Sequence, residues 1–332
     1  MAFLIAEVGQ AHDGSLGLAL SYIDALAETG VDAVKFQVHI ADAESSIHEP
    51  FRVKFSQQDK SRFNYWKRMG FSLDQWKLIK TRCNERGVEF LASPFSNAAV
   101  DLLEEVGVKQ YKIGSGEVNN FLLLEKIART GKPIILSSGM SSFSELDKTV
   151  EFLKRREIEF SILQCTTAYP TSPENYGLNV MGELKDRYNV AVGYSDHSAG
   201  IETCIAATAL GAEILEFHAV FDRRSFGPDA KSSLEIDEIS QLVKSVRNIA
   251  LAQENPGNKE DNSAFKDLKN IFEKSLAVNK DLSVGHILKF NDLEAKKPKG
   301  FGIPASEFEK VIGKELKQSL KQWDFLKGEN LG

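Results

Sequence analysis

The strongest constraint on the fold is the alternation of short apolar segments with amphipathic segments over most of the 332 residues. The apolar segments, rich in β-branched and aromatic residues, lie at 3–8, 32–37, 88–92, 110–113, 133–136, 160–164, 190–194 and 213–218. Helical patterns separate them, and Ser72, Ser96 and the pair Ser141 and Ser144 stand where N-caps are expected. Strands that alternate with helices pair in parallel. Eight such units predict a (β/α)8 barrel, and a doubly wound open sheet is the alternative.

Composition narrows the class of protein. The chain is 42% hydrophobic and 27% charged, as in ordinary globular proteins, and has no apolar run long enough to span a membrane. A net charge of −6 disfavours binding to nucleic acid or anionic membranes. The first residues lack the basic segment of a signal peptide, and the three cysteines match no metal spacing. We therefore expect a cytoplasmic protein with reduced thiols.

The composition changes near residue 253, which predicts two domains. Residues 1–252 form the expected barrel, and the polar, breaker-rich stretch 253–270 reads as a linker. Residues 271–332 have short apolar alternations and turn residues, which predict a small, mostly-β module. A core of that size is marginal, so we expect the module to pack against another surface.

Every predicted strand ends in polar side chains. In order along the chain they are Glu7; Lys35 and Gln37; Ser93; Lys112, Ser115 and Glu117; Ser137; Thr167 and Tyr169; Ser195 and His197; and Glu216 and His218. Because active sites of (β/α)8 barrels lie at the carboxyl ends of the strands, we expect these residues to surround one site.

Two lysines inside otherwise apolar strands indicate anion binding. Lys35 and Lys112 would pay a desolvation penalty unless an anion or a carboxylate meets them. Together with the Gly114-Ser115-Gly116 turn they suit a ligand that carries a phosphate and a carboxylate. Two alternatives remain open: an internal ion pair of Lys112 with Glu7 or Glu117, and a Schiff-base lysine.

Two histidines at the ends of the last two strands indicate a metal site. His197 and His218 would be neighbours in a barrel and could bind a divalent ion whose other positions stay open. Glu216 and Asp196 could orient them or accept protons. Of the other histidines, His39, His48 and His286 are expected in loops or exposed positions, whereas His12 is a candidate for the mouth of the barrel.

Two loops add further candidates. Asp229, in the loop after His218, is either a contact to substrate hydroxyls or only a turn residue. The segment 42–71 is long, aromatic and basic, which is typical of a lid or an interface.

These motifs together resemble a known family. IAEVGQAHDGS, AVKFQ, SPFS, YKIGSGE, ILSSGM, QCTTAYPT, GYSDHS and the EFH…GPD pair are similar to the sialic acid synthase family, over the whole chain. The tail, with SLAV, KKPKGFGIP and VIGKEL, resembles that family's C-terminal antifreeze-like (SAF) domain. The resemblance implies a (β/α)8 barrel followed by a SAF domain, and a homodimer in which each SAF domain covers the partner's active site.

The resemblance also implies roles for the strand-end residues. Phosphoenolpyruvate would be held by Lys35, Ser93, Lys112, Ser115, Ser137 and Ser195, with Glu117 and Thr167 as further substrate-binding candidates. His197 and His218 would bind Mn²⁺, with Mg²⁺ or Co²⁺ as alternatives, and Glu7 would lie beside the metal. Gln37, Tyr169 and Asp229 would contact an amino sugar, and Glu216 is the candidate base.

The chain departs from the family pattern mainly at the sugar-binding end. Ala11 stands where the first motif usually has Asn, Thr167 where Asn is frequent, and Phe217 where Lys is common. An arginine expected in the SAF domain is missing, and Lys297 or Lys299 is expected to replace it. A substrate other than N-acetylmannosamine is therefore open.

The predicted activity is a nonulosonic acid synthase. It would condense phosphoenolpyruvate with an N-acetylated hexosamine aldehyde and release phosphate by C–O cleavage, with help from the metal. The alternatives are a Schiff-base pyruvate aldolase, a phosphoenolpyruvate-dependent 3-deoxy sugar acid phosphate synthase, for which 52–68 would have to hold a second basic cluster, and a non-enzymatic carbohydrate- or ice-binding protein.

Overall fold

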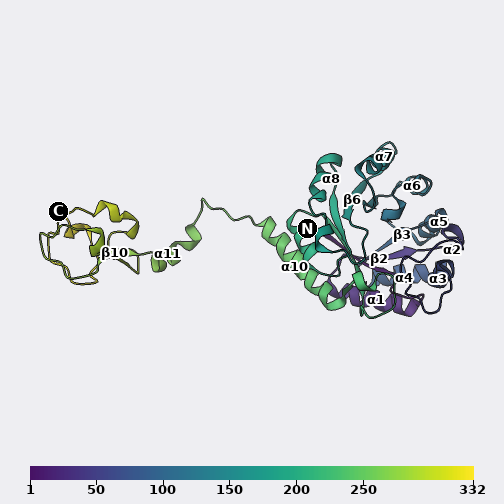
Figure 1. The fold of residues 1–332 in the computed structure, drawn as a ribbon, viewed down its shortest axis with the longest axis horizontal. Coiled ribbons are helices and arrows are strands. Elements are labelled where there is room, and N and C mark those ends of the chain that lie inside the picture. The colour runs from purple at the N-terminus through teal and green to yellow at the C-terminus, as the bar shows by residue number, and fades with distance from the viewer. The chain divides into compact units, whose positions relative to one another are not determined.

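The computed structural model describes residues 1–332, which divide into two compact units (Figure 1). Unit 1 is Met1–Asn255 and unit 2 is Pro256–Gly332. The stretch expected as a linker begins inside the last helix of unit 1 and includes a short helix of unit 2, α11 (Lys266–Phe272). No helix in the chain is both long enough and apolar enough to cross a membrane.

Unit 1 contains the eight predicted strands. They are β1 (Phe3–Gly9), β2 (Ala33–Val38), β3 (Glu89–Pro94), β4 (Tyr111–Ile113), β5 (Ile134–Ser137), β6 (Phe160–Cys165), β7 (Val192–Asp196) and β8 (Ile214–Val220). Neighbours pair in parallel in the order β3-β2-β1-β8-β7-β6-β5-β4, and β3 also lies beside β4. The sheet therefore curls into a nearly closed barrel, so the (β/α)8 prediction is confirmed over the open sheet.

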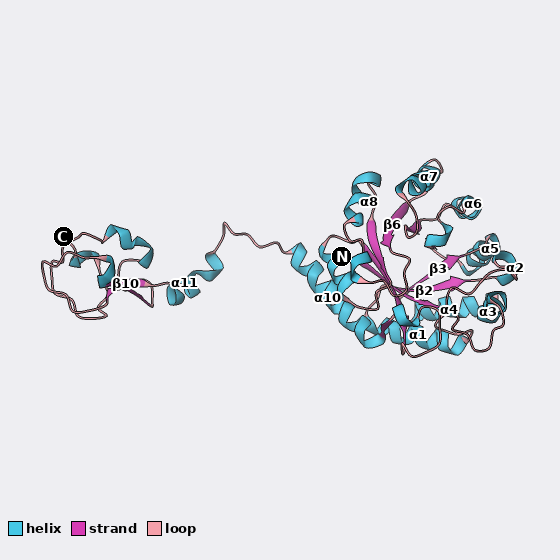
Figure 2. Cartoon of the chain, viewed as in Figure 1, coloured by secondary structure: helices cyan, strands magenta, loops and turns pink.

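Helices follow each barrel strand and surround the sheet (Figure 2). They are α1 (Leu16–Thr29), α4 (Leu73–Glu85), α5 (Asn97–Val106), α6 (Phe121–Ala128), α7 (Phe143–Lys154), α8 (Val180–Tyr188), α9 (Glu202–Ala209) and α10 (Ile236–Glu254). Ser72 and Ser96 are N-caps, as predicted. The cap of α7 is Ser142, not Ser141 or Ser144, because Ser142 forms a capping box with Glu145.

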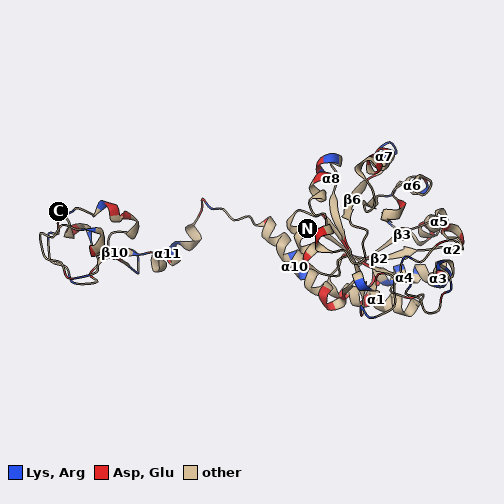
Figure 3. Ribbon diagram, viewed as in Figure 1, with Lys and Arg blue, Asp and Glu red and all other residues tan.

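Two further helices and a short strand lie in the connections. The long segment between β2 and α4 contains α2 (Ala41–Glu44) and α3 (Arg62–Met69). After β8, the strand β9 (Leu234–Glu235) pairs with it in parallel. Lys and Arg are interspersed with Asp and Glu on the outer helices (Figure 3).

The interior of the barrel has an apolar layer below a polar one. Ile5, Ala33, Leu91, Ile135 and Leu163 form one buried cluster inside the barrel. Two residues further along the same strands come Glu7, Lys35, Ser93, Ser137 and Cys165. Since side chains of a strand alternate between its faces, these residues point to the same interior, one layer nearer the carboxyl ends. The strand period thus places the reactive side chains directly above a layer of apolar side chains.

Unit 2 is a small, mostly-β unit with its own core. Strands β10 (Ser275–Val278) and β11 (Leu293–Lys296) pair antiparallel, and isolated bridges join most of the remaining extended chain. Its buried side chains include Leu276, Val278, Leu288 and Leu326. The mostly-β prediction is confirmed, whereas the assignment to the SAF domain stays a prediction.

Gly193 of β7 marks the tightest packing in the barrel. A Cβ at this position would collide with the Ile214 carbonyl oxygen and lie 2.7 Å from Leu163 Cδ2. We expect Gly193→Ala to lower the free energy of unfolding of unit 1 by about 1–3 kcal/mol, because the barrel cannot open without breaking strand pairing. Urea unfolding followed by far-UV circular dichroism measures this.

Gly182 in α8 provides the matched control. A Cβ there would meet nothing within 4 Å, so Gly182→Ala should be neutral or stabilise by up to about 1 kcal/mol through helix propensity. Equal effects of the two substitutions would contradict this account of the barrel.

Candidate active site

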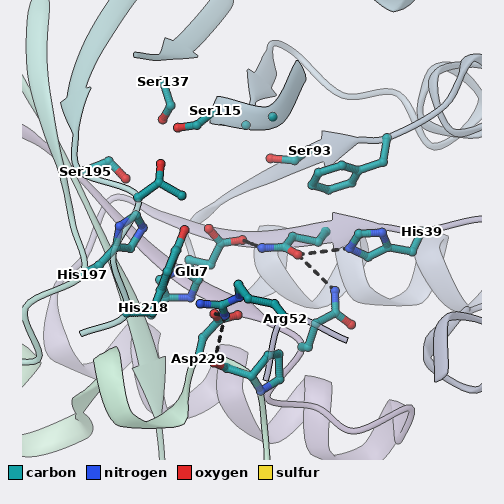
Figure 4. Close-up of a pocket in the computed structure, with 18 of the residues that line it drawn as sticks. Glu7, His39, Arg52, Ser93, Ser115, Ser137, Ser195, His197, His218 and Asp229 are labelled. Atoms are coloured by element: carbon teal, nitrogen blue, oxygen red, sulfur yellow. Dashed lines mark hydrogen bonds and ion pairs between the residues drawn. The ribbon is translucent and has the colours of Figure 1, made fainter. Parts of the chain in front are cut away.

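A cavity of about 320 Å³ opens at the carboxyl ends of the barrel strands. Most of the predicted site residues of unit 1 line it: Glu7, Lys35, Gln37, Ser93, Lys112, Ser115, Ser137, Thr167, Tyr169, Ser195, His197, Glu216, His218 and Asp229. Glu117, His12 and Asp196 do not. Figure 4 shows many of these side chains pointing into the same space. The geometry therefore gathers the residues that the strand pattern singled out.

Four buried charges form the floor of the cavity. Lys35 Nζ lies 2.5 Å from Glu7 Oε2 and 3.7 Å from Glu216 Oε1, and Lys112 Nζ lies 3.5 Å from the same Glu216 oxygen. All four side chains are at most 5% exposed. The alternative prediction, an ion pair of Lys112 with Glu7 or Glu117, is wrong. The carboxylate beside Lys112 is that of Glu216.

The two lysines differ in how well their charges are compensated. Burial would lower the pKa of Lys35, but the charges of Glu216 and Glu7 raise it above its ordinary value. Burial lowers the pKa of Lys112, and Glu216 offsets this only in part. Burial also opposes ionisation of Glu7, yet Lys35 and His218 bring its pKa down to about 2. Lys112 is thus the cation that gains most from an additional anion.

Serine hydroxyls surround the ammonium groups. Lys35 donates to Ser93 Oγ (3.3 Å) and Lys112 donates to Ser137 Oγ (2.6 Å). Ser195 Oγ donates to Glu216 Oε1 (3.2 Å), and the second oxygen of Glu216 is buried without a hydrogen-bond partner. These hydroxyls can rotate to donate to an oxyanion when one enters.

A second group of hydroxyls lies against the backbone of Gly139. A Cβ at Gly139 would lie 2.6 Å from Ser115 Oγ and would overlap Thr167 Oγ1. Thr167 Oγ1 is buried and has no hydrogen-bond partner. Ser115, Thr167 and this close backbone approach together form a cradle whose donors are available to an anion.

The two imidazoles are adjacent, as predicted. The ring centroids of His197 and His218 are 5.3 Å apart, and Tyr169 packs 4.2 Å from the His197 ring. His197 Nδ1 lies 3.0 Å from the Thr166 carbonyl oxygen. A carbonyl accepts only, so Nδ1 carries a proton and Nε2 faces away from this contact.

These imidazoles fit a divalent ion held by two protein ligands. Burial lowers the pKa of His218 and favours the neutral form that binds metals. Burial also opposes charge on His197, but Cys165 and the Thr166 carbonyl raise its pKa to about 9, so metal binding there would release a proton. No group of three or more His, Cys, Asp or Glu side chains is placed to hold a metal ion, so metal binding by His197 and His218 stays a prediction.

Hydrogen bonds fix the orientation of Gln37 in the cavity wall. Its Nε2 donates to Glu7 Oε1 (3.0 Å), and its Oε1 accepts from Gln10 Nε2 (3.2 Å). His39 Nε2 lies 3.1 Å from the same Gln37 oxygen and must donate to it. His39 Nδ1 lies 2.5 Å from Glu44 Oε1.

His39 lies in a loop, between β2 and α2, as expected, but an exposed position for it is wrong. His39 is buried and lines the cavity, stacked between Trp66 at 3.7 Å and Phe95 at 4.3 Å. The expectation for His12 is also wrong, because His12 is buried against Phe71 and does not line the cavity. Both placements depend on packing from 62–71, which the local sequence around each histidine does not reveal.

Two other predicted residues lie elsewhere. Glu117 ends a short turn, Ser115–Glu117, and its carboxylate accepts from Asn120 Nδ2 (2.7 Å) instead of lining the cavity. The prediction that Glu117 contacts substrate is therefore not supported by the geometry. Lys297 belongs to unit 2, where its ammonium lies 4.7 Å from the centre of the Phe272 ring. Its contact with a sugar stays a prediction.

Arg52 is a cavity residue that the sequence analysis missed. Its Nη2 donates to Asp229 Oδ1 (2.6 Å) and to the Pro228 carbonyl (2.9 Å), and its guanidinium carbon lies 4.0 Å from the centre of the Tyr169 ring. The only sequence signal for it is the basic and aromatic character of 42–71.

The four-charge floor generates a prediction for stability. Glu216→Gln leaves the Lys112 ammonium buried without a carboxylate, so we expect the free energy of unfolding to fall by about 3 kcal/mol. Glu202→Gln, on the exposed start of α9, is the matched control and should change little. Adding Lys112→Met to Glu216→Gln should restore much of the loss in urea unfolding. A double variant no more stable than Glu216→Gln would contradict the pairing.

Comparisons with known proteins show which family the chain belongs to. The profile of the NeuB family matches residues 22–258. The chain is 36% identical to the N,N'-diacetyllegionaminic acid synthase of Campylobacter jejuni, over 98% of both chains. It is 33% identical to the N-acetylneuraminate-9-phosphate synthase of Homo sapiens, over 98% of this chain and 92% of that one.

A solved structure agrees with the fold as well. The crystal structure of N-acetylneuraminic acid synthetase from Leptospira borgpetersenii, in complex with citrate, superposes with a TM-score of 0.70 at 33% identity. The match covers 80% of this chain and 90% of that one. The profile match and the extent of these similarities show that this chain belongs to the NeuB family.

Proposed function

We propose that this protein is a nonulosonic acid synthase that condenses phosphoenolpyruvate with the open-chain aldehyde of an N-acetylated amino sugar. Its membership of the NeuB family, with relatives named as synthases of legionaminic and neuraminic acids, supports this activity. The observation that carries the proposal is the single cavity in which two buried lysines and two imidazoles face each other.

The donor end of the cavity suits phosphoenolpyruvate. Lys35 and Lys112 supply positive charge for its phosphate and carboxylate, and the hydroxyls of Ser93 and Ser137 already contact these lysines. The cradle of Ser115 and Thr167 beside Gly139 offers further donors to an oxyanion. Fixing the anion in this way orients carbon 3 toward the second substrate, a positioning effect worth several kcal/mol.

The imidazoles mark where the aldehyde would be held. When bound to His197 and His218, Mn²⁺ (or Mg²⁺ or Co²⁺) would polarise a carbonyl oxygen as a Lewis acid. Gln37, Tyr169 and Asp229 lie around this point and are proposed to contact the sugar. Tyr169 contacts the His197 ring and so forms one wall of the part of the cavity proposed to hold the sugar, the acceptor end.

The bond changes follow from this arrangement. Carbon 3 of phosphoenolpyruvate forms a bond to the aldehyde carbon, and the aldehyde oxygen takes a proton to become a hydroxyl. Water adds to carbon 2, and the bond between carbon 2 and the phosphate oxygen breaks, which gives the keto acid and inorganic phosphate. Glu216 is the better candidate to accept the proton from water. Lys35 lowers the pKa of Glu7 and makes it a weak base, whereas one oxygen of Glu216 has no hydrogen-bond partner.

The Schiff-base alternative is less well supported by the geometry. Nucleophilic lysines need a neutral amine, and Lys35 is ion-paired at 2.5 Å with a raised pKa. Lys112 has a lowered pKa, but it is in contact with Ser137 and Glu216 and lies where an anion would bind. Borohydride treatment with pyruvate is therefore expected to trap no covalent adduct.

Metal removal tests the proposed chemistry. Phosphate release from phosphoenolpyruvate should require an N-acetylated hexose, should fall to background after exhaustive chelation, and should return when Mn²⁺ is added. A colorimetric phosphate assay with mass spectrometry of the keto acid measures this. His48→Ala, at an exposed position, is the control for His197→Ala and should leave activity unchanged. Full activity in the chelated protein would rule out the role of the metal.

We also propose the homodimer that the family resemblance implies, with SAF domains exchanged between subunits. The marginal size of unit 2, with its own small core, is consistent with a need for a further packing surface. Light scattering of the purified protein measures its mass in solution.

A further inference from the structure

The loop that carries Arg52 is firmly attached to the barrel. Phe51 and Phe55, in the loop between α2 and α3, pack against Tyr65 and Trp66 of α3, with the Phe55 ring 5.1 Å from the Tyr65 ring. Arg68 of α3 then joins the loop to the end of β1: it donates to both oxygens of Asp59 and to the carboxylate of Asp13. Arg52 is therefore held at the cavity by a packed scaffold and is not a free surface arginine.

The guanidinium of Arg52 joins two loops at the acceptor end. It stacks over the ring of Tyr169, which follows β6. It also pairs with Asp229, which follows β8 (Figure 4). Asp229 and Tyr169 are the side chains proposed to contact the sugar. A group bound between them would meet Arg52 directly.

Much of the donor capacity of Arg52 is unused. Its two hydrogen bonds, to Asp229 and to the Pro228 carbonyl, both start from Nη2. The N–H groups on Nε and Nη1 have no partner in the protein. They point to opposite sides of the planar guanidinium, so each can donate separately to an oxygen acceptor. The side chain is 36% exposed where it lines the cavity, so these unused donors are accessible to a ligand.

The charges around Arg52 limit which sugar substrate fits at this end of the cavity. Asp229 compensates Arg52 at 2.6 Å, and Glu49 compensates Arg62, the other arginine of the lining, at 3.1 Å. A second phosphate would therefore meet no uncompensated arginine at this end of the cavity. The neighbouring walls, Phe51 and Val53, are apolar and suit a methyl group.

We propose that Arg52 is a specificity-determining residue that donates hydrogen bonds to the acetamido oxygen of an uncharged amino sugar. The acetamido methyl would lie against Phe51 and Val53, and the acceptor would carry no phosphate. This inference rests on the proposed function of the same cavity. It assigns the recognition of the N-acyl group to the barrel's own chain.

Steady-state kinetics of Arg52→Met tests this assignment. The KM for the N-acetylated acceptor should rise by about ten- to a hundredfold, because a charge-assisted hydrogen bond is lost, while the KM for phosphoenolpyruvate stays the same. Arg52→Lys should not restore the acceptor KM, since an ammonium on a flexible stem does not hold its donors in the fixed directions of a planar guanidinium. Lys54→Met, an exposed cation of the same loop, is the matched control and should behave as the unaltered protein.

A change in the substrate separates recognition from a structural effect. With the parent hexose that lacks the acetamido group, Arg52→Met and the unaltered protein should have similar kcat/KM, because the partner of Arg52 is already missing. An equal loss with both acceptors would overturn the assignment. A preference of the unaltered protein for the 6-phosphorylated acceptor would overturn the claim about charge.

The outcomes keep the two proposals apart. If the unaltered protein releases no phosphate with any acceptor of the panel, the proposed function fails. If it is active and Arg52→Met has an unchanged acceptor KM, the function stands and the inference about Arg52 is wrong. Thermal unfolding of each variant shows whether the substitution has disturbed the fold.

Discussion

The interaction on which the site depends is the buried set of Glu7, Lys35, Glu216 and Lys112. Each of these charges would be costly alone in the interior of a barrel, and removing one partner exposes the cost of the other. The set is stable because Lys35 bridges two carboxylates at 2.5 and 3.7 Å. The charge of Lys112 is only partly compensated, because burial lowers the pKa of Lys112 in spite of the nearby Glu216 carboxylate. The same arrangement that keeps the protein folded thus leaves one cation ready for an anionic substrate.

The sequence is sufficient to predict this part of the site, and the reason is geometric. Strand residues alternate with a period of two, so Ile5 and Glu7, or Leu91 and Ser93, must share a face one layer apart. Parallel pairing then brings the carboxyl ends of all strands to one rim. The lysines and the histidine pair could be placed together from spacing alone. The partner of Lys112 could not, because which carboxylate reaches it depends on the tilt and register of the strands.

Residues outside the strands are less predictable. Arg52 and His39 belong to the segment after β2, where the path of the chain is set by the packing of Phe51, Phe55, Tyr65 and Trp66. Glu117 follows the predicted strand end by a few residues, but a turn directs its carboxylate to Asn120. The donor end is thus built by strands and the acceptor end largely by loops.

Calorimetric titration of phosphoenolpyruvate into the unaltered protein and into Lys112→Met tests the central claim most directly. If the Lys112 ammonium binds the anionic substrate, the unaltered protein binds phosphoenolpyruvate and the folded variant binds it at least about tenfold more weakly. The same affinity in both proteins would contradict the account, because the buried charges would then have no part in holding the substrate.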